Sequence, residues 1–169
     1  MFLILQIVSV LLVALAAALP LAHALELPGK MRLDKSDYLV TQPIYYPGFT
    51  IAAGVGEGGG MLATLALLLM TPRQGAEFAL TLAALIALVT MHVAYWVCTH
   101  PVNKSWLERE PLKGMGAGFF ALDPLGRGAP RRSSSDDWQR LRNRWEYSHV
   151  LRAALAGVSL VCSIAAVAL

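Results

Sequence analysis

Hydrophobic residues along this chain are gathered into four long blocks, with polar segments between them. Each block contains about 20 or more residues, and a helix of that length, rising ~1.5 Å per residue, crosses the ~30 Å hydrocarbon core of a bilayer. Backbone amides within lipid need partners in their own segment, so each block is expected to form an α-helix. The blocks run from Phe2 to Leu27, from Phe49 to Met70, from Phe78 to Cys98 and from His149 to Leu169.

Local signals predict where these helices begin and end. Pro28-Gly29 predicts the end of the first helix, and His100-Pro101 predicts the end of the third. The fourth helix is expected to begin in the polar segment, because Trp138, Trp145 and Arg152 are spaced as on one helical face. We therefore expect helices over residues 2–27, 49–71, 77–99 and 136–169, the last entering the membrane at about residue 148.

The predicted fold is all-α, an integral membrane four-helix bundle in which residues 1–169 make a single transmembrane domain. A soluble bundle is disfavoured, because the first, third and fourth blocks are apolar all round and lack the polar outer face that water requires. The run Ala22-His23-Ala24 resembles a signal-peptide cleavage site. The long apolar stretch, with no basic segment before it, instead favours a retained membrane span.

Composition and charge add a topology to this fold. Charged residues make up only 15% of the chain, below the roughly one quarter found in soluble domains, and the mean hydropathy is +0.54. Nine of the 14 basic residues lie between His100 and Tyr147, and three more lie between Pro28 and Gly48. Basic residues accumulate on the cytoplasmic side of membranes, so both long loops are expected in the cytoplasm and both termini outside. The net charge of +3 therefore reflects topology, and no nucleic-acid partner is expected.

Histidines and carboxylates from all four predicted helices fall at one depth, the cytoplasmic third of the bilayer. Ionisable groups inside a membrane are costly to bury and usually face other helices. Glu57 has the most unusual setting, because the segment from Gly54 to Gly60 contains five glycines, which let a second backbone or a flat ligand approach closely. The members of this layer are His23 and Glu26 from the first helix, Glu57 from the second, His92 from the third and His149 from the fourth.

Three kinds of site are compatible with this layer. The first is a transition-metal site built from all five residues, with His23 and Glu26 turned toward one ion. The second is a haem site, with His92 and either His23 or His149 as axial ligands. The third is a pocket without a metal, in which Glu57 or a histidine is a general base and Arg152 binds an anion. The structural alternative is that polar pairs simply hold the helices together, at ~0.6 kcal/mol per hydrogen bond.

Three runs of sequence at the helix ends carry a further signal. They are Ala22 to Lys30 at the end of the first helix, His100-Pro101-Val102-Asn103 at the end of the third, and Asn143 to Arg152 at the start of the fourth. Together they resemble the anthrone-oxygenase-like family of small four-helix bacterial membrane proteins, and the resemblance covers nearly the whole chain. It implies four spans in the bacterial inner (cytoplasmic) membrane and, for a few family members, oxidation of an anthrone to an anthraquinone.

The chemistry of an anthrone suits such a pocket. An anthrone is flat and apolar and has an acidic C–H group conjugated to its carbonyl, and its enolate can react with dioxygen without a metal. We therefore expect a membrane-embedded oxidoreductase or cofactor-independent oxygenase that acts on a lipophilic, aromatic or quinoid small molecule near the cytoplasmic face. The alternatives are a haem- or metal-binding subunit for electron transfer, and a non-enzymatic protein that binds lipid or a partner. A homo-oligomer is compatible with each of them.

The site residues follow from depth and helical phase. A base, aromatic walls and a donor for the enolate oxygen are the parts that this reaction needs. Glu57 or His92 could be the base, and Asn103 could assist Arg152 at the oxygen. The candidate catalytic residues are Glu57, His92, His149 and Arg152, and the candidate substrate-binding residues are Trp96, Asn103 and Trp145.

Overall fold

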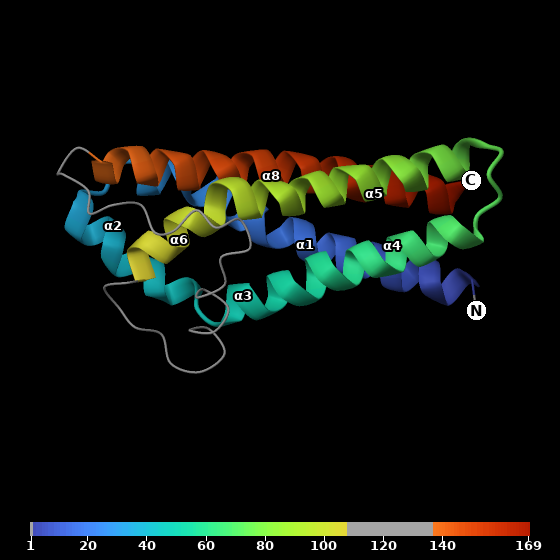
Figure 1. Ribbon diagram of the computed structural model, residues 1–169, viewed down its shortest axis with the longest axis horizontal. Helices are drawn as coiled ribbons and strands as arrows, with labels where there is room; N and C mark the ends of the chain where they lie inside the picture. Colours follow the sequence, from blue (N-terminus) through green and yellow to red (C-terminus); the bar gives the residue numbers. More distant parts are fainter. Residues whose placement is uncertain (1, 108–136) are drawn as a thin grey trace.

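The structure is a computed structural model that describes residues 2–107 and 137–169, and within these ranges every regular element is a helix (Figure 1). Two short segments, η2 and η3, have π-helical hydrogen bonding, and η1 is a 3₁₀ helix. In chain order the elements are α1 (Phe2–Lys30), α2 (Lys35–Thr41), η1 (Gln42–Tyr45), α3 (Gly48–Ala53), η2 (Gly54–Gly58), α4 (Gly59–Met70), α5 (Ala76–Ala94), η3 (Tyr95–Thr99), α6 (His100–Leu107) and α8 (Asp137–Ala168).

Four helical rods are long and apolar enough to cross a membrane: Phe2–Lys30, Gly48–Met70, Ala76–Lys104 and Asp137–Ala168. They run side by side along the long axis of the molecule, and both chain ends lie at one end of the bundle (Figure 1). The opposite end carries α2, α6 and the start of α8. The predicted all-α architecture with four membrane-crossing lengths is thus confirmed. Which end faces the cytoplasm stays a prediction.

Two helix ends differ from those predicted at prolines. Helix α1 continues through Pro28 to Lys30, and the third rod continues through Pro101 to Leu107. The last turn of α1 is held by an ion pair between Lys30 Nζ and Glu26 Oε2 at 2.7 Å and by a hydrogen bond that Arg32 donates to the Pro28 carbonyl at 3.0 Å. Pro101 lies in the first turn of α6, where a missing backbone donor costs little. Proline therefore marks neither end. The predicted start of the fourth helix, residue 136, lies outside the described residues.

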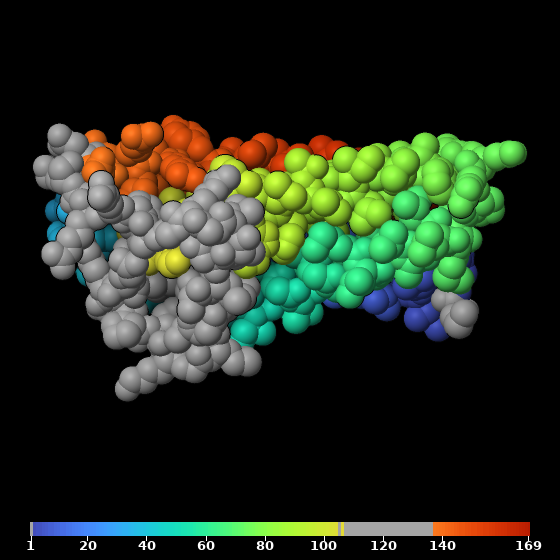
Figure 2. Space-filling model, in the orientation of Figure 1, coloured from blue at the N-terminus to red at the C-terminus, as the bar shows by residue number. Residues whose placement is uncertain are grey.

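The packing is tightest between α1, α4, α5 and α8. Helix α8 packs along both α1 and α5, and α4 packs against the same two helices. Gly56 brings the second rod against α1, since a Cβ atom there would lie 2.8 Å from the Ala16 backbone nitrogen. The face visible in Figure 2 extends without a break from α8 across α5 to α4. Large apolar side chains such as Leu69, Ile86 and Val161 are exposed on these helices, as expected of helices that cross a membrane.

Candidate functional site

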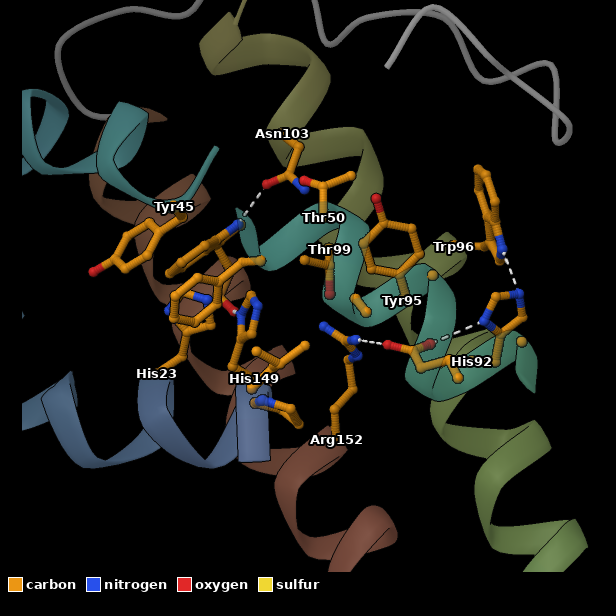
Figure 3. A pocket seen from close by; sticks show the side chains of 18 of the residues that line it. His23, Tyr45, Thr50, His92, Tyr95, Trp96, Thr99, Asn103, His149 and Arg152 are labelled. Carbon is orange, nitrogen blue, oxygen red and sulfur yellow. Dashed lines mark hydrogen bonds and ion pairs between the residues drawn. The ribbon is translucent and has the colours of Figure 1, made fainter. Parts of the chain in front are cut away.

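A cavity of about 220 Å³ lies between the helices in the half of the bundle that carries α2 and α6 (Figure 3). All four rods and η1 contribute to its wall. Its lining is Leu19, Pro20, His23, Tyr45, Tyr46, Phe49, Thr50, Ala53, Gly54, Glu57, Gly58, Met61, His92, Tyr95, Trp96, Thr99, Asn103, Trp145, His149 and Arg152.

The residues predicted for catalysis and substrate binding all line this cavity. Those residues are Glu57, His92, Trp96, Asn103, Trp145, His149 and Arg152. His23 lines it as well. Glu26 does not, because its carboxylate pairs with Lys30 and accepts a 2.7 Å hydrogen bond from the Tyr45 hydroxyl.

A chain of polar contacts crosses one side of the cavity from α8 to η3 (Figure 3). Arg152 pairs with Oε1 of Glu57, whose Oε2 lies 2.9 Å from Nδ1 of His92. The Trp96 indole N–H donates to Nε2 of His92 at 2.9 Å. Because an indole can only donate, Nε2 is the acceptor, and the ring proton is on Nδ1, facing the carboxylate. Glu57 and His92, the two expected bases, are therefore both occupied by partners within the protein.

The other side of the cavity is aromatic. The His23 ring contacts Tyr45, Trp145 and His149 with centroid distances of 4.4, 4.8 and 4.3 Å. The Trp145 indole N–H donates to Oδ1 of Asn103 at 2.6 Å, which places Asn103 as a support for the aromatic wall. His149 Nδ1 lies 2.9 Å from the backbone carbonyl of Trp145. Its Nε2 has no hydrogen-bond partner among the described residues. His149 is therefore the imidazole that offers a lone pair to a ligand.

Arg152 is the strongest indication that something polar binds here. Its side chain is 4% exposed, and its guanidinium lies 5.1 Å from the centroid of the Tyr95 ring. The Nε atom is buried and has no hydrogen-bond partner in the part of the chain that the structure describes. Buried donors are nearly always paired, so an unpaired one in a cavity wall calls for an acceptor from a ligand or water.

Two π-helical segments flank the cavity, η2 on the second rod and η3 on the third. Such segments are rare and are common at functional sites, because the extra residue in the turn rotates side chains out of helical phase. Glu57 lies on η2, and Tyr95 and Trp96 lie on η3. At Gly54 and Gly58 a Cβ atom would have nothing within 4 Å. The glycine-rich run thus has two roles. Gly56 permits close packing against α1, and Gly54 and Gly58 leave open space in the cavity wall.

A second buried charge network lies behind the aromatic wall, and sequence reasoning placed it incorrectly. Lys30 was counted among the basic residues of a cytoplasmic loop, but it is the last residue of α1 and is 5% exposed. Its ammonium lies 3.8 Å from Glu146, which is fully buried and accepts a 2.9 Å hydrogen bond from the Tyr38 hydroxyl. Burial and the Glu146 carboxylate raise the pKa of Tyr38 well above its usual value, so Tyr38 stays protonated as a donor. The sequence had no signal for this contact, since it joins residues 108 positions apart.

The cavity also uses aromatic residues that sequence reasoning had not assigned. Tyr45, Tyr46, Phe49 and Tyr95 all line it. Tyr45 and Tyr46 lie close to Pro43 and Pro47 in the loop expected between the first and second helices. Phe49 and Tyr95 carry no comparable signal, because each is one apolar residue in a long apolar block.

The expected ligand sets for a metal or haem are not assembled. Within residues 2–107 and 137–169 no three His, Cys, Asp or Glu side chains gather closely enough to hold a metal ion. Glu26 turns to Lys30, and its Oε2 is 3.8 Å from His23 Nδ1. For haem, both nitrogens of His92 are hydrogen-bonded.

Comparison with known proteins leaves the site to be judged on its own geometry. No protein-family model, no curated protein and no solved structure matches this chain. The resemblance to the anthrone-oxygenase-like family accordingly rests on the three helix-end motifs.

Proposed function

We propose that this chain binds a small lipophilic ring compound within the bacterial inner membrane and oxidises it in an oxygenase-type reaction without a resident cofactor. One observation carries the proposal. An aromatic-walled cavity between membrane-crossing helices contains a buried Arg152 Nε–H and a His149 Nε2 lone pair, neither with a partner among the described residues. Small-molecule sites typically have mostly apolar walls and a few convergent polar groups.

The size of the cavity limits the ligand. An apolar cavity of ~150 Å³ is enough to bind benzene. At about 220 Å³ the present cavity suits one ring or two fused rings. A third ring, as in an anthrone, would extend past Gly54, which is exposed and leaves open space where a side chain would be. A flat ligand lying between η2 and η3 fits this opening.

In the proposed reaction, His149 is the base, Arg152 is the hydrogen-bond donor, and Glu57, His92 and Trp96 support Arg152. His149 Nε2 removes a proton from the activated C–H group, and the Arg152 guanidinium donates to the oxygen on which negative charge develops. The carbanion then reacts with dioxygen, the co-substrate. A CH₂ group loses two hydrogens and gains one oxygen atom as a carbonyl, while the second oxygen atom leaves with those hydrogens as water. Glu57 holds Arg152 in place, and His92 and Trp96 hold Glu57.

Turnover of anthrone by protein in lipid nanodiscs tests this function. Wild type should consume one dioxygen per anthraquinone formed. His149→Gln should lower kcat by about 10²–10⁴-fold, the usual contribution of a general base, while the Kd for anthraquinone from tryptophan quenching changes little. Gly157→Ala is the control on the same helix, because a Cβ atom there has nothing within 4 Å. The proposal fails if wild type binds neither anthrone, anthraquinone nor naphthoquinone, or if His149→Gln keeps full turnover.

A further inference from the structure

Two adjacent histidines in the cavity wall, His23 and His149, have different hydrogen-bond partners at their Nδ1 atoms. His23 Nδ1 lies 3.2 Å from the ammonium of Lys30, and His149 Nδ1 lies 2.9 Å from the carbonyl oxygen of Trp145. Both side chains are 4% exposed, and their ring centroids are 4.3 Å apart. Neither ring has a partner at Nε2 in the described part of the chain. These two atoms are therefore the polar ends that the rings can offer to a ligand.

The outer partners fix the protons of the two rings. An ammonium group only donates, so Nδ1 of His23 accepts and the ring proton of neutral His23 is on Nε2. A carbonyl oxygen only accepts, so the ring proton of His149 is on Nδ1 and its Nε2 keeps a lone pair. The tautomer of an imidazole is set by the hydrogen bond made at its other nitrogen. The cavity is thus given one imidazole donor and, beside it, one imidazole acceptor.

Lys30 is positioned for this task from outside the cavity, which it does not line. Its Nζ is 2.7 Å from Glu26 and 3.8 Å from Glu146. It also lies over the rings of Tyr45 and Trp145, 4.6 and 4.9 Å from their centroids. Two carboxylates and two aromatic faces hold the ammonium at the far edge of His23. A lysine buried to 5% exposure is expensive, and adhesion between helices alone would not require an imidazole among its partners.

We propose that Lys30 is a positioning residue that makes His23 a hydrogen-bond donor next to the acceptor His149, so that the cavity selects ring compounds carrying a carbonyl oxygen close to a hydroxyl group. In the complex with a quinone, which has no C–H group left to deprotonate, His23 Nε2–H donates to the carbonyl and the hydroxyl donates to His149 Nε2. Hydroxylated quinones and hydroxylated aryl ketones of one or two rings have this pattern. This selectivity rests on the proposed function of the cavity, but the tautomers can be measured without any ligand.

The first experiment is ¹⁵N NMR of histidine-labelled full-length protein in nanodiscs. Wild type should show His23 protonated on Nε2 and His149 protonated on Nδ1. Lys30→Met should convert His23 to a mixture of tautomers and leave His149 unchanged, and Lys30→Arg, whose guanidinium also only donates, should restore the wild-type pattern. Lys35→Met is the matched control in the adjacent α2. The proposal is overturned if His23 is protonated on Nδ1 in wild type, or if Lys30→Met leaves its tautomer unchanged.

The second experiment measures selectivity with 6-hydroxy-1,4-naphthoquinone, whose hydroxyl is too far from either carbonyl for an internal hydrogen bond, and with its 6-methoxy ether, which lacks the donor. Wild type should prefer the hydroxyl compound by about fivefold in Kd, as expected for one net hydrogen bond. Lys30→Met should weaken binding of both quinones by a similar factor, because the donor to their carbonyl is no longer fixed, while Lys30→Arg and Lys35→Met bind like wild type. Equal wild-type affinities for the two compounds overturn the selectivity. If neither compound nor an anthrone binds, the proposed function is lost, and the NMR result still decides the role of Lys30.

Discussion

The two halves of this bundle use buried polar groups in opposite ways. In the half that contains the chain ends, polar side chains pair one to one across helices. Ser9 and Thr64 are joined at 2.9 Å, and Ser159 donates to the Ala84 carbonyl at 2.9 Å. Of the buried polar atoms described in that half, only the Ser163 hydroxyl has no partner. This terminal half is a helix interface in which hydrogen bonds serve adhesion.

In the other half, which contains the cavity, several buried polar atoms have no hydrogen-bond partner among the described residues. Arg152 Nε, Glu146 Oε2 and both side-chain polar atoms of Gln42 have no partner among the described residues. Both π-helical segments lie in this half as well. Adhesion does not explain unpaired groups, because each costs free energy on burial without returning a contact. The contrast supports the proposal that the polar layer of the cavity half binds a ligand, whereas the polar groups of the terminal half serve helix packing.

The largest expected effect comes from breaking the buried ion pair of the cavity half. Arg152→Met leaves the Glu57 carboxylate buried with His92 as its remaining partner, and removing one member of such a pair costs about 3–5 kcal/mol. The double variant Glu57→Gln/Arg152→Met removes both charges and should recover most of that loss. Unfolding in mixed micelles by SDS titration measures both. A loss below about 1 kcal/mol in the single variant would make this pair equivalent to the weak pairs of the terminal half.

An intermediate effect on stability is expected at Gly56, in contrast to Gly58 two positions later. Gly56→Ala places a Cβ atom 2.8 Å from the Ala16 backbone, and overpacking of this kind typically costs about 1–3 kcal/mol. Gly58→Ala meets nothing within 4 Å and should leave stability unchanged or raise it by about 0.5–1 kcal/mol, because alanine is the better helix former. SDS titration reads the stability, and tryptophan quenching by naphthoquinone reads the cavity. Gly58→Leu should abolish that quenching in a folded protein. Wild-type binding by Gly58→Leu would move the ligand site away from η2.

The smallest effect on stability is expected for the hydrogen bonds that join helices in the terminal half. Ser9→Ala should cost about 0.6 kcal/mol, the average for a hydrogen bond between membrane helices. The double variant Ser9→Ala/Thr64→Val removes both polar groups and should cost less than two such losses, since no buried group stays unpaired. SDS titration measures the difference, and anthrone turnover should remain at the wild-type level in both variants. A fall in turnover would show that the two halves are coupled.

The sequence predicted most members of the site because depth along a membrane helix can be counted in residues. His23, Glu57, His92 and His149 were placed in one layer by length and hydropathy, and all four line the cavity. Glu26, placed in the same layer, does not line it. The helix ends predicted at Pro28 and at Pro101 are wrong. Helix α1 continues to Lys30, which pairs with Glu26 one turn earlier, and Pro101 is tolerated in the first turn of α6. The π-helical segments were not predicted, since a one-residue change of phase leaves no mark in an apolar run.

Residue spacing alone predicts that four apolar helices bring histidines and carboxylates to a common level, because a membrane span has a fixed length and polar groups within it are few. The pairing of those groups depends on the folded arrangement of the helices. Glu57 pairs with Arg152 and His92, Glu26 pairs with Lys30, and the Nε2 atoms of His23 and His149 have no partner among the described residues. The physical reason is that a hydrogen bond requires a distance of about 3 Å and a direction, which depend on helix rotation and contacts between distant segments.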